Sequence, residues 1–177
     1  MKSLIIILTY LLGLTNVRAQ GTAAENLKVE MKKLAYMAGK WSGEASMRQQ
    51  NGTILKVNQE EIIQYKLDET VLLIEGTGRN NEAAVVFNAL ALISYNQYSK
   101  SFAMKSHVMD GNQTDAYFKI LSENNFEWGF ETPAKAKIKY TIVLNTQEKS
   151  WAEKGEYSPD GTTWYPFMEM NLKKVSE

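Results

Sequence analysis

Two periods of hydrophobic residues divide the chain into a short helical part and a long series of strands. Near the start, apolar residues recur at spacings of four, three and four, at Leu27, Met31, Leu34 and Ala38. This spacing places them on one face of a helix, with charged residues on the other faces. Gly39 follows, where a helix C-terminal cap is expected. The pattern therefore predicts one helix of about 14 residues that begins at Glu25.

After Trp41 hydrophobic and polar residues alternate, as in strands that are buried on one side. The alternation is clean in three segments, at 102–108, 126–131 and 137–144. Asn-Gly and Asp-Gly pairs, which supply the positive φ of tight hairpins, are among the turn-forming residues between segments. These turn signals occur at nine places: Asn51-Gly52, Asp68-Glu69, Arg79-Asn80-Asn81, Asn96-Gln97, Asp110-Gly111-Asn112, Asn124-Asn125, Thr132-Pro133, Asn145-Thr146 and Ser158-Pro159-Asp160-Gly161.

Nine turns between ten segments predict an all-β fold, an antiparallel up-and-down meander of about ten strands preceded by one short α-helix. An open sheet of this width would leave two unpaired edges, and closing it into a barrel removes them. A barrel of about ten strands has room inside for a ligand. No linker or repeat interrupts residues 20–177, so the sequence predicts a single β-barrel domain there.

The segment from Phe87 to Tyr95 is apolar on both faces, unlike its neighbours. A strand of this kind needs cover on its outer face as well as on its inner face. We expect either the helix or a second copy of the chain to provide that cover. The second alternative would make the protein a homodimer.

Residues 1–19 have the pattern of a signal peptide rather than of the fold. Lys2 supplies a positive charge, an apolar run of eleven residues extends from Leu4 to Leu14, and Val17-Arg18-Ala19 fits a cleavage site before Gln20. The run is shorter than the roughly 20 residues that a membrane-spanning helix needs. We expect export to the periplasm or the extracellular space without stable membrane insertion, although an uncleaved anchor stays open.

The amino-acid composition excludes several kinds of binding site. The 177 residues include 20 basic and 20 acidic side chains, and loss of Lys2 and Arg18 would leave 18 against 20, a net charge of about −2. This balance gives no basic surface for nucleic acid. The chain has no cysteine and one histidine. Disulfides, thiolate metal sites and sites that need two imidazoles are therefore excluded.

The segment Gly39-Lys40-Trp41-Ser42-Gly43-Glu44-Ala45 resembles the G-x-W-x-G-x-[GA] start of the calycin superfamily, which includes the lipocalins. The resemblance implies that Trp41 closes one end of the barrel and that Lys173 or Lys174 stacks on it. A helix directly before this strand is more similar to nitrobindin-type barrels. Fatty-acid-binding proteins are disfavoured, because they insert a helical pair where this chain has Asn51-Gly52.

Further motifs resemble a family of exported lipocalin-like barrels of undefined function. They are Ser94-Tyr95 in the middle of the chain and a D-G-x-x-W-x-x-x-M-E ending that runs from Asp160 to Glu169. The resemblance covers most of the chain after residue 20. It implies a fold and a binding cavity, and it implies no established reaction.

The favoured function is a non-enzymatic binding protein that holds a small apolar or amphipathic ligand inside the barrel. Methionine, aromatic and hydroxyl side chains on the apparent inner face suit such a ligand. The expected ligand-binding residues are Trp41, Met104, Ser106, Trp128, Tyr140 and Met168. No catalytic residue, cofactor or metal ligand is assigned, and whether the chain is an enzyme stays open.

Two alternatives follow from individual ionisable side chains. His107 could ligate haem, with peroxynitrite or nitric-oxide chemistry as in the nitrobindin relatives, although the alternation places it on the outer face. Glu75 and Glu169 could instead be paired carboxylates that line the cavity of an uncharacterised enzyme. The phase of Glu169 is opposite to that of Met168 and Met170, which counts against this pair unless a bulge inverts it.

Overall fold

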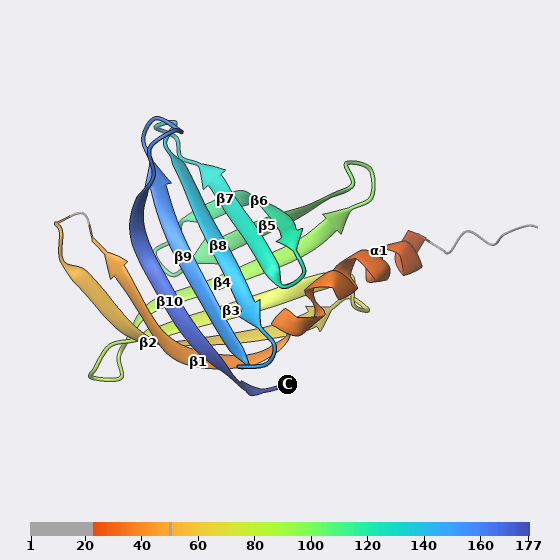
Figure 1. Cartoon of the computed structure of the whole chain (residues 1–177), viewed down its shortest axis with the longest axis horizontal. Coiled ribbons are helices and arrows are strands. Elements are labelled where there is room, and N and C mark those ends of the chain that lie inside the picture. Colours follow the sequence, from red (N-terminus) through yellow and green to blue (C-terminus); the bar gives the residue numbers. More distant parts are fainter. Residues whose placement is uncertain (1–22, 50) are drawn as a thin grey trace, which may run out of the picture.

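A computed structural model describes residues 23–49 and 51–177, and there the chain forms a helical segment followed by ten strands (Figure 1). The expected signal peptide lies outside the described residues. The helical segment consists of the α-helix α1 (Ala23–Met31) and the 3-10 helix η1 (Lys32–Met37). The strands are β1 (Gly39–Arg48), β2 (Ile54–Lys66), β3 (Val71–Arg79), β4 (Val85–Asn96), β5 (Ser101–Val108), β6 (Gln113–Ser122), β7 (Asn125–Glu131), β8 (Lys137–Asn145), β9 (Ser150–Ser158) and β10 (Tyr165–Ser176).

The ten strands form a closed antiparallel barrel in which each strand pairs with its neighbours in sequence. The first and last strands complete the circle, with Gly43 of β1 opposite Leu172 of β10. The predicted all-β, ten-stranded up-and-down barrel is confirmed. Every predicted turn falls at a boundary between strands, and Gly52, Gly111 and Gly161 have the positive φ expected of their hairpins.

The helical segment differs from the single α-helix expected from the sequence. It changes to a 3-10 helix at Lys32, and Ala38 already has an extended backbone. Three fully buried residues, Met31, Leu34 and Met37, are spaced three apart. A 3-10 helix has three residues per turn, so it aligns all three on one face, whereas a regular α-helix would rotate Met37 away from Met31. Burial of this face therefore favours the tighter turn.

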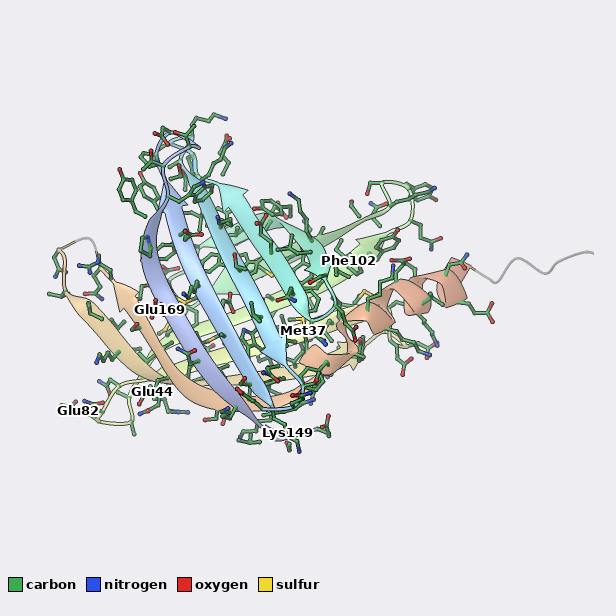
Figure 2. The ribbon with its side chains drawn as sticks, in the orientation of Figure 1. Met37, Glu44, Glu82, Phe102, Lys149 and Glu169 are labelled. Carbon is green, nitrogen blue, oxygen red and sulfur yellow. The ribbon has the colours of Figure 1, made fainter. Side chains whose placement is uncertain are left out.

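The helical segment closes one end of the barrel, and Figure 2 labels Met37 where this segment meets the strands. The Tyr65 hydroxyl donates a 2.7 Å hydrogen bond to the Met31 carbonyl and so ties β2 to the helix. Trp41 is fully buried at this end, and its indole donates a 2.8 Å hydrogen bond to the Met37 carbonyl. Lys174 lies over the Trp41 ring, with Nζ 5.4 Å from the centroid.

These contacts match the roles that the calycin resemblance implied for Trp41 and for a basic residue of the last strand. Lys174 takes the basic position, and its Nζ also lies 4.5 Å from the Tyr36 ring centroid. Lys173 instead donates a hydrogen bond to the Glu148 carbonyl. The two lysines point to opposite faces because successive side chains of a strand alternate.

The apolar strand β4 is not covered by the helix on its outer face. Leu90 and Leu92 point outward and are 38% and 40% exposed, while Ala91 and Ile93 point into the barrel and are buried. The expectation that the helix covers this face is wrong, because the helix lies across the end of the barrel. Cover by a second copy stays a prediction. Within residues 23–49 and 51–177, no helix has the length and apolar character to cross a bilayer.

Candidate functional site

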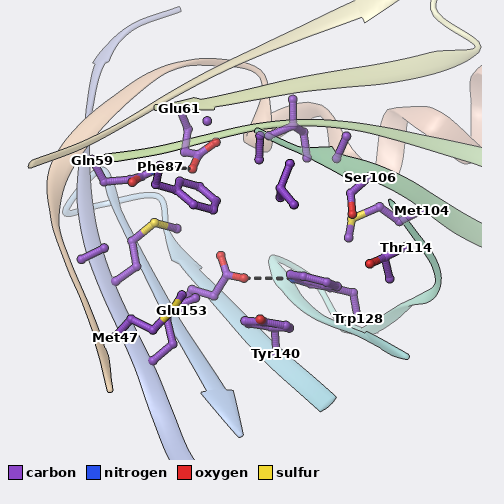
Figure 3. Close-up of a pocket in the computed structure, with 18 of the residues that line it drawn as sticks. Met47, Gln59, Glu61, Phe87, Met104, Ser106, Thr114, Trp128, Tyr140 and Glu153 are labelled. Atoms are coloured by element: carbon purple, nitrogen blue, oxygen red, sulfur yellow. Dashed lines mark hydrogen bonds between the residues drawn. The ribbon is translucent and has the colours of Figure 1, made fainter. Parts of the chain in front are cut away.

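A cavity of about 710 Å³ lies inside the barrel, between the strands and the helical segment that closes one end (Figure 3). Its size falls within the range of small-molecule sites, roughly 300–1,000 Å³. Met37 lies at its closed end, and most of its wall comes from aliphatic and methionine side chains that point inward from the strands. Representative wall residues are Ala45, Val57, Ile74, Ala91, Ile142 and Met170.

Five of the six ligand-binding residues expected from the sequence line this cavity: Met104, Ser106, Trp128, Tyr140 and Met168. They come from β5, β7, β8 and β10, so the alternation in each of these strands identified the inward face correctly. Trp41 is not part of the lining. It lies behind the wall, where its ring meets Trp151 edge to face with centroids 5.6 Å apart.

An aromatic cluster forms one part of the wall. The rings of Trp128 and Tyr140 stack with centroids 3.9 Å apart and an angle of 7° between their planes. Phe167 meets Tyr140 edge to face at 5.7 Å. Gly155 lies opposite Tyr140 on β9, and a Cβ there would come within 2.8 Å of the Tyr140 ring. The glycine therefore makes room for the stacked pair.

Glu153 brings a carboxyl group into this apolar space from β9. Its two oxygens accept hydrogen bonds from two indoles, from Trp128 at 2.9 Å and from Trp151 at 3.1 Å. The residue is only 6% exposed. Burial disfavours the charged form and raises the pKa of Glu153 to about 7, although both indole hydrogen bonds act in the opposite direction.

Glu61 brings a second carboxyl group into the cavity from β2 and is 8% exposed. The Gln59 amide donates a 2.7 Å hydrogen bond to Glu61 Oε1. Burial raises the pKa of Glu61 to about 8; the Gln59 hydrogen bond opposes this shift, and the Glu153 charge adds to it. Both carboxyl groups therefore have a protonated form that is substantially populated near neutral pH.

Glu61 and Glu153 are not among the residues predicted from the sequence, although the alternation that located the other wall residues also applies to them. Glu61 has the phase of Ile63 and Tyr65, and Glu153 has the phase of Trp151. Position 61 would have been found by following the inward phase through the charged run of β2.

The carboxylates proposed instead, Glu75 and Glu169, are both exposed on the outer face of the barrel, and Figure 2 labels Glu169 on β10. The alternative in which they pair across the cavity is therefore wrong. A register shift does occur between Pro166 and Met168, but Met168 still points inward and Glu169 outward. The bulge therefore does not move the Glu169 side chain to the inner face of the barrel.

His107 also lies on the outer face, next to the exposed Lys105 that pairs with Asp115. It is the one histidine of the sequence, so no imidazole points into the cavity. The cavity therefore does not fit a haem held through histidine. Among the described residues that line the cavity there is no lysine or arginine either.

The sequence itself matches no protein-family model and no curated protein sequence. Comparison of the folds finds similar barrels among solved structures. The crystal structure of Rv2717c from M. tuberculosis matches with a TM-score of 0.61 and 7% identity, over 81% of this chain and 96% of that one. The S-type phycobiliprotein lyase CPES from Guillardia theta matches with a TM-score of 0.59 and 10% identity, over 89% and 99% of the two chains.

These similarities agree with the closed ten-stranded antiparallel barrel described above. At such low identity the likeness concerns the fold alone. The features particular to this chain are its cavity and the two carboxyl groups inside it.

Proposed function

We propose that this protein is a non-enzymatic binding protein that holds a small apolar or amphipathic molecule inside the barrel. The observation that carries the proposal is the cavity of about 710 Å³, which the helical segment closes at one end. A barrel packed for stability alone would fill this space with side chains. Aliphatic, methionine and aromatic walls with a few polar groups are typical of sites for such molecules.

Export is the second part of the proposal and rests on the signal-peptide pattern of residues 1–19. A binding protein outside the cytoplasm would act by taking up or carrying its ligand. The apolar outer face of β4, with Leu90 and Leu92, is where a second copy of the chain would pack if the protein dimerises.

The test uses a neutral fluorescent probe, N-phenyl-1-naphthylamine, whose emission rises in apolar surroundings. Ser106 points into the cavity and Ala103 points outward from the same strand, so Ser106→Phe and Ala103→Phe form a matched pair. We expect one probe per protein molecule, binding that is weakened about tenfold or more by Ser106→Phe, and no change with Ala103→Phe. Native mass spectrometry of the protein purified from cells would then identify a bound small molecule.

Saturable binding that Ser106→Phe leaves intact would contradict the proposal, since the probe would then occupy another surface. Absence of any saturable binding, together with a protein mass without an adduct, would also contradict it.

A further inference from the structure

The cavity wall contains two acidic side chains among its apolar and neutral polar residues. Glu61 and Gln59 on β2 and Glu153 on β9 project into the same apolar space, and Figure 3 shows both carboxyl groups pointing into it. No basic side chain among the described residues lines the cavity to neutralise them. The interior therefore carries two acidic groups whose electrostatic complement is missing from the wall.

The position of Glu61 depends on glycines of the neighbouring strand. Gly76 lies directly opposite Glu61, and Gly78 lies opposite Gln59. A Cβ at Gly76 would lie 2.8 Å from Glu61 Oε1 and 2.9 Å from Oε2, and one at Gly78 would lie 2.9 Å from the Gln59 amide oxygen. Two strand glycines thus provide the space in which this polar pair lies against the wall.

The second oxygen of Glu61 has no hydrogen-bond donor within the described residues. Oε1 accepts the Gln59 hydrogen bond, whereas no described side chain or backbone group donates to Oε2. The residue is nevertheless more than nine-tenths buried. Oε2 is not among the fully buried polar atoms that lack a partner, so it is accessible from the cavity, and a donor on a ligand could bond to it there.

Glu153 is held differently, since both of its oxygens already accept indole hydrogen bonds. Each carboxylate oxygen can accept a second hydrogen bond, so Glu153 keeps capacity for a ligand. One of its donors, Trp128, belongs to the stacked pair with Tyr140. Aromatic rings beside a carboxylate are favourable surroundings for an organic cation, because the ring faces carry negative charge.

We propose that the cavity selects an amphipathic amine, whose cationic head lies between Glu61 and Glu153 and whose apolar part lies along the aliphatic and methionine wall. This inference rests on the proposed binding function and names the class of its ligand. The ammonium group supplies the positive charge that the wall lacks, and its N–H groups can donate to the remaining acceptor sites of the two carboxyl groups. An anionic amphiphile of the same size would bind more weakly, because no basic side chain among the described residues lines the cavity and an ionised carboxyl group there would repel it.

A second measurable consequence of the proposal is a change in protonation when the amine binds. Near neutral pH the two carboxyl groups retain protons in the empty cavity, because burial raises the pKa of Glu61 to about 8 and that of Glu153 to about 7. A cation beside them favours the charged forms. Binding of an alkylamine, which is itself protonated at this pH, therefore releases protons into the solvent.

The experiment compares three probes of equal chain length, decylamine, decanol and decanoate, by isothermal titration calorimetry below their micelle concentrations. We expect decylamine to bind about tenfold or more tightly than decanol, and decanoate to bind more weakly than either. Titrations in two buffers of different ionisation enthalpy should show proton release with decylamine and none with decanol.

Three variants locate the effect. Glu61→Gln keeps an acceptor for the Gln59 amide and removes the charge, so it should lower decylamine affinity about tenfold and leave decanol affinity unchanged. Glu153→Gln should act in the same direction. Glu169→Gln, on the outer face, is the control and should change neither.

The results that would contradict the inference can be told apart from those that would also contradict the proposed function. If decanol binds and decylamine binds no more tightly, the ligand class is wrong and the binding function stands. Decanoate binding as tight as that of decylamine would overturn the inference in the same way. If no probe binds to the unmodified protein, both the inference and the proposed function fall. Equal loss of decylamine affinity in Glu169→Gln would show that general surface charge attracts the amine, and it would also overturn the proposal.

Discussion

Replacing Glu61 with glutamine should remove a loss of stability that the unmodified protein undergoes as the pH rises. In the folded state burial raises the pKa of Glu61 from 4.5 to about 8. Between these values the folded protein binds a proton that the unfolded chain has released, so the free energy of unfolding falls with increasing pH. The stability is fully present below a pH of about 4.5 and is lost by about pH 8.

The size of this effect follows from the shift. One pKa unit corresponds to about 1.4 kcal/mol, so ionising Glu61 costs on the order of 5 kcal/mol at alkaline pH. Glutamine has nearly the same shape, does not ionise, and can still accept the 2.7 Å hydrogen bond from Gln59. The variant should therefore equal the unmodified protein at about pH 4.5 and exceed it by several kcal/mol at about pH 9.

Urea denaturation followed by tryptophan fluorescence at these two pH values measures the difference. Glu75→Gln is the control, because Glu75 lies on the adjacent strand β3 and is exposed on the outer face. That variant should lose stability with pH as the unmodified protein does. Parallel losses in the unmodified protein and in Glu61→Gln would refute the reasoning, since Glu61 would then ionise as readily in the folded state as in the unfolded one.

Three further predictions concern the packing around the cavity. Trp41→Ala should destabilise the protein by about 3–5 kcal/mol in urea denaturation, because it removes a fully buried ring from the closed end; Trp164→Ala, which loses a contact with a surface lysine, should cost about 1 kcal/mol or less. Gly76→Ala should destabilise the protein, and the cost should shrink in a Glu61→Ala background, since the three atoms nearest to the new methyl all belong to Glu61; an unchanged cost would place the strain elsewhere. Thr132→Val should leave stability unchanged or raise it by about 1 kcal/mol, because the buried Thr132 hydroxyl has no partner among the described residues; a clear loss would mean that the hydroxyl is satisfied, for instance by water.

The barrel could be predicted from the sequence because its two determinants are local. Alternation with period two and Asn-Gly or Asp-Gly turns each act over a few residues, and ten strands in sequence order leave closure as the way to pair both edges. The same alternation placed Met104, Ser106 and Tyr140 on the cavity wall.

The helix before the barrel was also predicted, but its change to a 3-10 helix and the carboxyl pair could not be predicted in the same way. The change to a 3-10 helix depends on how Met31, Leu34 and Met37 pack against the end of the barrel. Local helix propensities carry no information about this packing. The pairing of Glu61 with Gly76 depends on the strand register, because the glycine matters only when it lies opposite the glutamate. Choosing carboxylates by sequence context alone selected Glu75 and Glu169, which the register places outside.

The most direct test of the proposed function is to determine whether a small molecule binds inside the barrel. The sequence has four tryptophans, whose indole N–H signals can be resolved by nuclear magnetic resonance of the 15N-labelled protein. Trp128 and Trp151 line the cavity and donate to Glu153, whereas Trp164 packs against Lys139 and lies outside the lining. On titration with decanol the account predicts saturable shifts of the Trp128 and Trp151 indole signals and an unchanged Trp164 signal. Shifts confined to Trp164, or no shift at any indole, would contradict it.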